Sequence, residues 1–175
     1  MQMQGQRNIN ASRDAVWRAL NDPEVLKACI PGCDEMEKTS ATTFEASVVQ
    51  KVGPMKARFK GVVELTDIVE DESYTISGEG KGGAAGFAKG GATVHLSDEG
   101  QGTLLVYQAE ARVGGKLAQL GSRLIDGFAK KMANEFFTRF QEAVEASAEE
   151  PLAEPEAEGD PPEEKKIGWF KRMFG

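Results

Sequence analysis

One long apolar stripe in the C-terminal half of the chain limits what this sequence can fold into. From Gly115 to about residue 146 the apolar residues recur with the period of an α-helix, so they share one face. The stripe consists of Leu117, Leu120, Gly121, Leu124, Ile125, Phe128, Met132 and Phe136. Such a helix must be covered along its length by another part of the chain.

The residues before this helix supply the cover. They alternate apolar and polar side chains in the manner of β-strands, and short polar turns such as "EDES" and "SDEGQG" favour antiparallel pairing. The predicted strands are 2–10, 44–52, 55–69, 73–80, 86–97 and 103–113, with short helices at 13–20 and 23–30. This order predicts an α+β helix-grip domain, in which a curved antiparallel sheet wraps round the long C-terminal helix.

The predicted inward face of the sheet carries little side-chain volume. Its small residues are Ala46, Ala57, Gly61, Gly78, Gly80, Ala109 and Ala111. Protein cores are close-packed, so this face cannot fill the space beneath a distant helix. Either the helix lies unusually close to the sheet, or the domain encloses a hydrophobic cavity for an elongated apolar ligand. In the second case the ligand-binding residues would be Phe59, Phe87, Tyr107, Leu117, Leu120, Gly121, Leu124 and Phe128.

Residues suited to catalysis or metal binding are scarce. The alternation of Val94 and Leu96 predicts that His95, the single histidine, points away from the cavity. Cys29 and Cys33 have a spacing that matches no common zinc or redox motif. We therefore expect no enzyme activity and no metal, with a small-molecule cyclase or hydrolase as the less favoured alternative.

A glycine-rich stretch, "GEGKGGAAGFAKGG" at 78–91, resembles a phosphate-binding loop only superficially. It lacks the G-K-[ST] sequence, and strands rather than a helix follow it. We interpret it as a mobile hairpin at the mouth of the cavity. The net charge of −7 and the pI of about 4.9 also argue against binding to nucleic acid. No apolar run approaches the roughly eighteen residues of a membrane-spanning helix, so we expect a cytoplasmic protein.

The composition divides the chain into three parts. Residues 1–146 form the predicted domain, and residues 147–164, "SAEEPLAEPEAEGDPPEE", form an acidic, Pro-rich disordered linker. Residues 165–175 form a short tail with an amphipathic helical pattern. Its apolar residues Ile167, Trp169, Phe170, Met173 and Phe174 share one side, and its cations are Lys165, Lys166, Lys171 and Arg172.

A helix this short should form only when its aromatic side is buried. An anionic inner leaflet of the cell membrane would bury that side and attract the cations, which predicts a peripheral protein on the cytoplasmic face. A groove on a partner protein is the alternative site for the tail.

The stretch "VWRALNDPEVLKACIPGC", together with the order of elements, resembles the family of the G subunit of carbon monoxide dehydrogenase, within the START-like (SRPBCC) superfamily. The resemblance covers residues 1 to about 146. Its most specific parts are Val16-Trp17, Leu20 to Glu24, Ile30 to Cys33, and the strand from Gly53 to Gly61. These residues are typical of determinants of the fold rather than of ligand contacts.

The resemblance implies a non-catalytic accessory protein that works beside a molybdenum hydroxylase such as carbon monoxide dehydrogenase. Combined with the predicted cavity and tail, it favours a carrier of an apolar, lipid-like ligand, with no covalent cofactor. Our hypothesis for that ligand is a respiratory quinone, because a quinone is a membrane lipid that could also interact with the enzyme. A membrane recruitment or assembly factor without a ligand is the alternative.

The tail sequence generates the first prediction. Deleting Lys165 to Gly175 should release the protein from anionic vesicles and leave its melting temperature unchanged, because the linker separates the tail from the domain. Co-sedimentation with vesicles and thermal unfolding measure the two effects.

Two substitution sets separate the apolar and the ionic contributions of the tail. Replacing Trp169, Phe170 and Phe174 by Ser should weaken vesicle binding at every salt concentration, since apolar burial is lost. Replacing Lys171 and Arg172 by Gln should weaken it mainly at low ionic strength. Capture of the tail peptide by a molybdenum hydroxylase, without any vesicle binding by the intact chain, would instead identify a partner-docking helix.

Overall fold

The computed structural model describes residues 1–149, and the predicted tail and most of the predicted linker lie outside the described residues. The chain forms, in order, β1 (Gln2–Ile9), α1 (Arg13–Leu20), α2 (Pro23–Cys29), β2 (Cys33–Lys38), β3 (Thr43–Val52), β4 (Met55–Val69), β5 (Ser73–Lys81), η1 (Gly83–Ala85), β6 (Phe87–Glu99), β7 (Gly102–Gly114), η2 (Gly115–Leu120) and α3 (Ser122–Glu149). Helix α3 therefore includes the first residues of the predicted linker.

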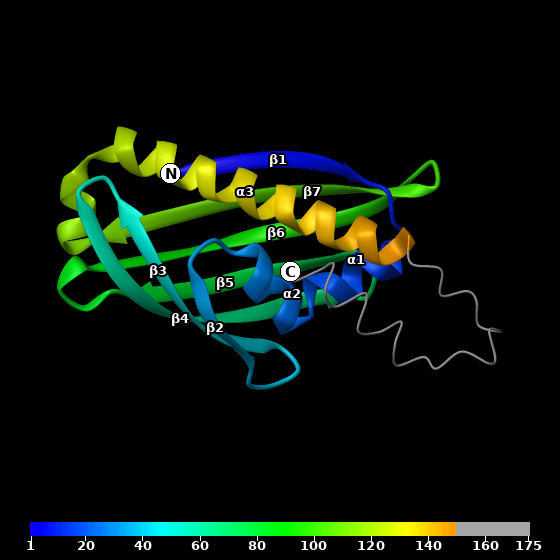
Figure 1. Ribbon diagram of the computed structural model, residues 1–175, viewed down its shortest axis with the longest axis horizontal. Coiled ribbons are helices and arrows are strands. Elements are labelled where there is room, and N and C mark those ends of the chain that lie inside the picture. The colour runs from blue at the N-terminus through cyan, green and yellow to red at the C-terminus, as the bar shows by residue number, and fades with distance from the viewer. Residues whose placement is uncertain (150–175) are drawn as a thin grey trace.

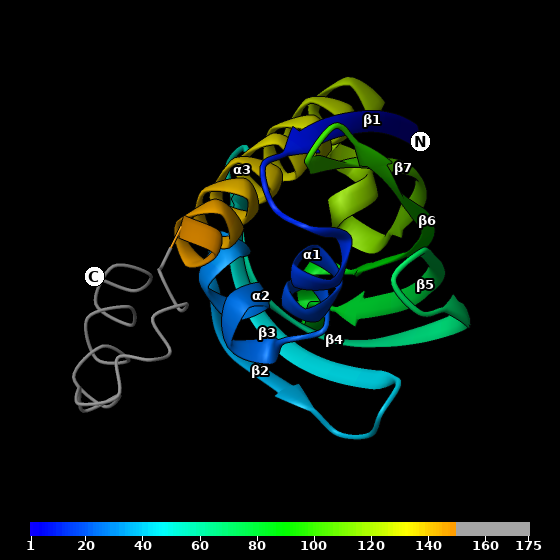
Figure 2. The same cartoon turned by 90° about the vertical axis from the view of Figure 1, so that its right-hand side faces the viewer.

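The strands form one antiparallel sheet in the order β1-β7-β6-β5-β4-β3-β2. The sheet curves strongly, and α3 crosses its concave side (Figure 1). Seen along the sheet, α1 and α2 stand across one open end of the curve (Figure 2). The predicted helix-grip fold is thus confirmed.

The connections fall at two opposite ends of the sheet, because successive strands run in opposite directions. The β3–β4 and β5–β6 turns lie at one end together with η2 and the start of α3, which we call the η2 end (Figure 1). The β2–β3, β4–β5 and β6–β7 turns lie at the other end, near α1, which we call the α1 end. The two ends carry different chemistry, as described below.

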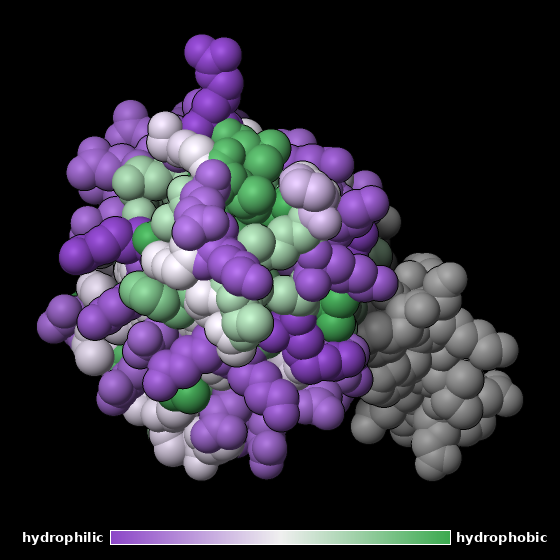
Figure 3. Space-filling view, turned by 90° about the vertical axis from the view of Figure 1, so that its left-hand side faces the viewer, coloured by the Kyte–Doolittle hydropathy of each residue, from purple (hydrophilic) through white to green (hydrophobic). Residues whose placement is uncertain are grey.

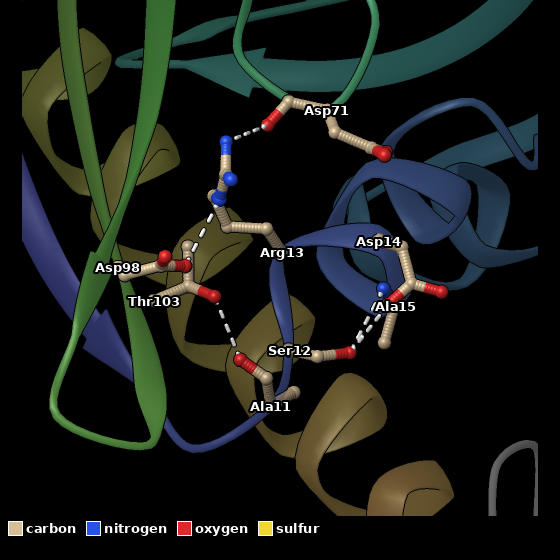
Figure 4. A network of polar contacts seen from close by, with 8 residues as sticks. All are labelled: Ala11, Ser12, Arg13, Asp14, Ala15, Asp71, Asp98 and Thr103. Atoms are coloured by element: carbon tan, nitrogen blue, oxygen red, sulfur yellow. Dashed lines mark hydrogen bonds and ion pairs between the residues drawn. The ribbon is translucent and has the colours of Figure 1, made fainter.

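Polar contacts fix α1 to the turns at its end of the sheet (Figure 4). The Arg13 Nε donates to Asp98 Oδ1 at 2.9 Å, and its Nη1 donates to the Asp71 carbonyl at 3.1 Å. The buried Thr103 hydroxyl donates to the Ala11 carbonyl at 2.7 Å. As predicted, Ser12 caps α1 by accepting a hydrogen bond from the Ala15 amide. These bonds join the β4–β5 and β6–β7 turns to the helix.

Two elements differ from the sequence prediction. Strand β2 was not predicted, because "CDEMEK" has one large apolar residue, Met36, and lacks the alternation typical of a strand. The strand lies at the edge of the sheet, where charged residues are common. The long helix was predicted to begin at Gly115, but residues Gly115–Leu120 form the 3₁₀ helix η2. Gly121, with φ +94, breaks the chain direction before α3 begins at Ser122.

The apolar core consists of two clusters. The larger one joins α1 and α2 to the sheet and to the C-terminal half of α3, with Val16, Leu105 and Phe140 almost fully buried. The smaller one lies at the η2 end and consists of buried Val52, Leu117 and Ile125 with their neighbours. Helix α3 is therefore held to the sheet near both of its ends.

The backbone conformation at position 32, within the "IPGC" stretch, requires glycine. Its φ is +81, and a Cβ atom there would lie 2.1 Å from the Val49 carbonyl oxygen. That contact is with backbone, so β3 would have to move. The residue therefore fixes how the chain enters β2.

We predict that Gly32→Ala destabilises the domain more than Gly100→Ala does. Both glycines have positive φ, so both alanines carry the left-handed penalty of about 1–2 kcal/mol. Only Gly32 adds a steric clash, of about 1–3 kcal/mol, because nothing lies within 4 Å of a Cβ at Gly100. Urea unfolding of both variants measures the difference, and equal losses would contradict the assigned role of Gly32.

Candidate functional site

A cavity of about 680 Å³ lies between the curved sheet and α3. Helix α3 lines it with Ala129, Met132 and Ala133, which belong to neither apolar cluster. The cavity thus occupies the stretch where α3 and the sheet do not touch. Of the two interpretations of the small inward residues, the geometry favours a cavity over a close approach of the helix.

Small residues make the sheet side of the cavity. Ala46, Gly61, Gly78, Gly80 and Ala111 line it, as the alternation predicted. Ala88 contributes in the same way from β6. Ala57 and Ala109, which were also expected on this face, are absent from the cavity wall.

Three of the eight residues predicted to bind the ligand lie on the wall: Phe59, Leu117 and Phe128. Phe87 does not, because Ala88 is the inward residue of that strand and Phe87 faces outward with 41% of its surface exposed. Leu124 is 40% exposed and packs on Gly53 of the β3–β4 turn.

The remaining three predicted residues also lie off the wall. Tyr107 stacks on Phe137 with ring centroids 4.7 Å apart and packs against the larger cluster. Leu120 and Gly121 belong to η2 and the break that follows it, since the helix begins later than expected. None of the three is among the residues that line the cavity.

Residues that the sequence prediction missed complete the wall. Leu20, Leu26 and Ile30 come from α1, α2 and the residue after α2. Met1 and Met3 contribute from the region of β1. No periodicity within one element indicates them, because they reach the cavity only through the packing of the short helices and the edge strand.

Tyr74 is the notable polar side chain of the wall. It is 5% exposed, lies edge-to-face against Trp17, and belongs to the larger cluster at the α1 side. Burial raises its pKa, so the hydroxyl is neutral and able to donate a proton. Within residues 1–149 this hydroxyl has no hydrogen-bond partner. Its position follows the register of Gly78 and Gly80, so the alternation along β5 could have identified it.

The other polar residues of the wall are already accounted for. Gln50 Nε2 donates to the Pro31 carbonyl at 2.6 Å, which holds the amide in place. Glu79 is exposed, between the inward Gly78 and Gly80. Apart from these residues and Tyr74, the wall is apolar. The cavity therefore suits a largely apolar molecule with few polar groups.

Groups with catalytic potential lie elsewhere. His95 is exposed on the outer face of β6. Burial raises the pKa of the Cys29 thiol to about 11, and the Cys33 thiol donates to the Glu35 carbonyl. Among residues 1–149 no group of three His, Cys, Asp or Glu side chains could hold a metal ion. Within the same residues, no helix combines the length and apolar character needed to cross a membrane.

The curved sheet, the long helix and the apolar cavity between them define a START-like helix-grip domain. The model of the family described as the G subunit of carbon monoxide dehydrogenase (CoxG) matches residues 5–145. The chain therefore belongs to this family, and membership implies an accessory role beside carbon monoxide dehydrogenase. Proteins of this family and fold are generally binding proteins without catalytic activity. No curated protein matches the chain in sequence.

Solved structures share the fold. A conserved protein from Geobacillus kaustophilus is 29% identical, with a TM-score of 0.76 over 82% of this chain and 95% of that chain. A protein from Thermus thermophilus is 18% identical, with a TM-score of 0.66 over 85% and 99% of the two chains. A protein from Chromobacterium violaceum is 14% identical, with a TM-score of 0.64 over 82% and 96%.

We predict that Gly80→Leu fills the cavity and lowers the affinity for an apolar fluorescent probe. A Cβ atom at Gly80 would make only ordinary contacts, 3.9 Å from Phe59 Cβ and 4.0 Å from the Lys60 carbonyl oxygen. Replacing a strand glycine should also raise the free energy of unfolding by about 0.5–1 kcal/mol. Probe titration and urea unfolding measure both effects.

Ser77→Leu is the matched control, since it adds the same side chain to the exposed outer face of the same strand. It should leave probe affinity unchanged. A loss of about 1–3 kcal/mol in Gly80→Leu with unchanged probe affinity would instead mean that the space is packed.

Proposed function

We propose that this protein is a non-catalytic carrier of an apolar, lipid-like ligand, and that it serves a molybdenum hydroxylase of the carbon monoxide dehydrogenase type. The observation that carries the proposal is the apolar cavity of about 680 Å³, which lies within the size range of ligand pockets, roughly 300–1,000 Å³. An apolar cavity of this size lacks the contacts of a packed core, and a bound apolar molecule would supply them.

The Tyr74 hydroxyl narrows the class of ligand. A buried hydroxyl without a partner costs about 1–3 kcal/mol, and a ligand oxygen that accepts its proton would remove that cost. The ligand should therefore carry an oxygen at one end and hydrocarbon elsewhere. A respiratory quinone has this composition, with carbonyl oxygens on its ring and an isoprenoid chain.

The shape of the cavity supports an elongated ligand with a defined direction. The larger cluster, which contains Tyr74, meets α3 from Phe136 onward, and the smaller cluster meets it up to Phe128. At 1.5 Å per residue these positions are about 12 Å apart, which exceeds the length of a single ring. We place the oxygen-bearing ring at the Tyr74 side and the chain toward the η2 end.

The predicted tail would hold the carrier on the cytoplasmic face of the cell membrane, next to the lipid phase from which an apolar ligand would come. Native mass spectrometry of the full chain purified with membrane lipids tests the carrier. An apolar adduct bound in stoichiometric amount is expected. A cavity that stays empty under all lipid conditions would favour the alternative, a recruitment or assembly factor without a ligand.

We predict that Tyr74→Phe removes the preference for a quinone over the corresponding hydrocarbon. The pair to compare is dimethylnaphthoquinone and dimethylnaphthalene, whose methyl groups block addition of the Cys33 thiol to the quinone ring. Loss of one hydrogen bond should weaken quinone binding by about 0.5–1.5 kcal/mol and leave hydrocarbon binding unchanged. Calorimetric titration of both ligands measures the preference.

Tyr107→Phe is the control, because it removes the same hydroxyl from a tyrosine that does not line the cavity. It should preserve the quinone preference. In the ligand-free protein, Tyr74→Phe should raise the free energy of unfolding, since an unpaired buried hydroxyl is removed. If Tyr74→Phe kept the same preference for the quinone, the Tyr74 hydroxyl would not take part in recognising the ligand.

A further inference from the structure

The η2 end of the domain carries a concentration of positive charge. Its cations are Lys51 and Lys56 on either side of the β3–β4 turn, Lys81 before η1, Lys116 in η2 and Arg123 at the start of α3. All five are exposed, and none forms an ion pair with another residue of 1–149. The segments 51–56, 81–87 and 114–124 contain no acidic residue. This is unexpected in a chain of net charge −7.

The α1 end has the opposite character. The β4–β5 turn contains Glu70, Asp71 and Glu72, and β6 ends with Asp98 and Glu99. One of these carboxylates, that of Asp98, is paired with Arg13. The domain is therefore electrically polarised along its long axis, with a basic η2 end and an acidic α1 end.

Apolar side chains are exposed among the cations of the η2 end. Leu124 is 40% exposed and Phe87 is 41% exposed. Viewed from this side, the surface shows an apolar area surrounded by hydrophilic side chains (Figure 3). Exposed apolar residues accompanied by cations are typical of surfaces that enter the interface of an anionic membrane.

The cavity reaches this end of the domain. Val52, Leu117 and Ile125 pack together there, are buried, and line the cavity, so they form its end wall. The two loops beside this wall lie close together: a Cβ at Gly86 would lie 2.1 Å from the Gly114 carbonyl oxygen, and a Cβ at Gly114 would lie 2.3 Å from Phe87 Cε1.

We propose that the η2 end of the folded domain docks on an anionic lipid surface, independently of the tail, and that the ligand crosses the end wall there. This inference rests on the carrier function proposed above. The cations would lie at the lipid head groups, Leu124 and Phe87 would enter the interface, and the acidic α1 end would point away from it. The ligand would then pass from lipid to cavity without crossing water.

Lipid fits this surface better than nucleic acid or an acidic protein would. Leu124 and Phe87 are exposed in the segments that carry the cations, and phosphate groups of a nucleic acid would leave them in water. The cavity behind the end wall is apolar, so an apolar phase on the outer side gives a continuous path. An acidic protein partner remains an outcome that the experiment can detect.

The test uses the full chain and vesicles of phosphatidylcholine with phosphatidylglycerol, compared with phosphatidylcholine alone. The tail alone predicts that its loss releases the protein, whereas docking by the η2 end predicts that binding to the anionic vesicles is weakened but persists when Ser replaces Trp169, Phe170 and Phe174. Adding Lys56→Gln and Lys116→Gln should weaken that binding at least about tenfold, since each cation near an anionic surface contributes substantially. The loss should shrink at high salt.

Arg18→Gln with Lys38→Gln is the matched control. It makes the same change in net charge at the α1 end. It removes one exposed ion pair, between Arg18 and Asp14, and the contacts of Lys38 with the Asn21 carbonyl and the Phe44 ring. It should leave vesicle binding unchanged or slightly changed. Equal losses in the two pairs would mean that net charge alone matters, which would overturn docking by the η2 end.

The orientation can be measured separately with brominated lipids, again in the chain with the substituted tail. A tryptophan introduced as Leu124→Trp should be quenched by the lipids, whereas Ala41→Trp, in the exposed β2–β3 turn at the α1 end, should not. Quenching of both positions, or of neither, would overturn the proposed orientation.

The failure of docking and the failure of the carrier function give different results. Lys56 and Lys116 do not line the cavity, so their replacement should leave the affinity for a soluble apolar probe unchanged. If the protein binds the probe but the two lysine substitutions do not change vesicle binding, the carrier function stands and the docking surface is rejected. Absence of probe binding in the unaltered chain would reject the carrier itself.

Discussion

The rest of the structure depends on how α3 is held to the sheet. The helix is packed at two places, against the larger cluster through residues such as Phe140 and against the smaller cluster through Ile125. Between them the sheet offers glycine and alanine, and the helix offers Ala129 and Ala133. Because a stiff helix packed at two points cannot bend toward the sheet between them, the space between the sheet and the middle of α3 remains open. The cavity is a consequence of where side-chain volume has been placed.

The same arrangement gives the domain a direction. Tyr74, the polar group of the cavity, lies with the larger cluster on the α1 side, while the exposed cations and apolar residues lie at the η2 end. An oxygen-bearing ring with a hydrocarbon chain matches this order of polar and apolar surfaces. The surface charge and the polarity of the cavity wall therefore change along the same axis, from the η2 end to the α1 end. A domain oriented at a charged surface would thus also orient a ligand in its cavity.

The sequence predicted the sheet, the helix and the existence of the cavity, because these follow from residue periodicity and from missing volume at Gly61, Gly78 and Gly80. It predicted the cavity wall less well. Phe87 was assigned the wrong face, since the glycine-rich turn before it obscures the register of β6. Tyr74 follows the alternation along β5 and could have been predicted, whereas the wall residues of α1 and α2 depend on packing between distant segments. The break at Gly121 was hidden within a helical apolar pattern that continues on both sides of it.

The position of β1 has a consequence for how the protein is made. β1 pairs with β7, and the Met1 ammonium group donates to the Ala111 carbonyl, 110 positions away in the chain. Pairing across such a separation is slow, because a long loop must close before any contact forms. Met1, Met3 and Ala111 all line the cavity, so its wall is incomplete until β7 has left the ribosome. The cavity can therefore take up its contents only after synthesis of the domain is almost finished.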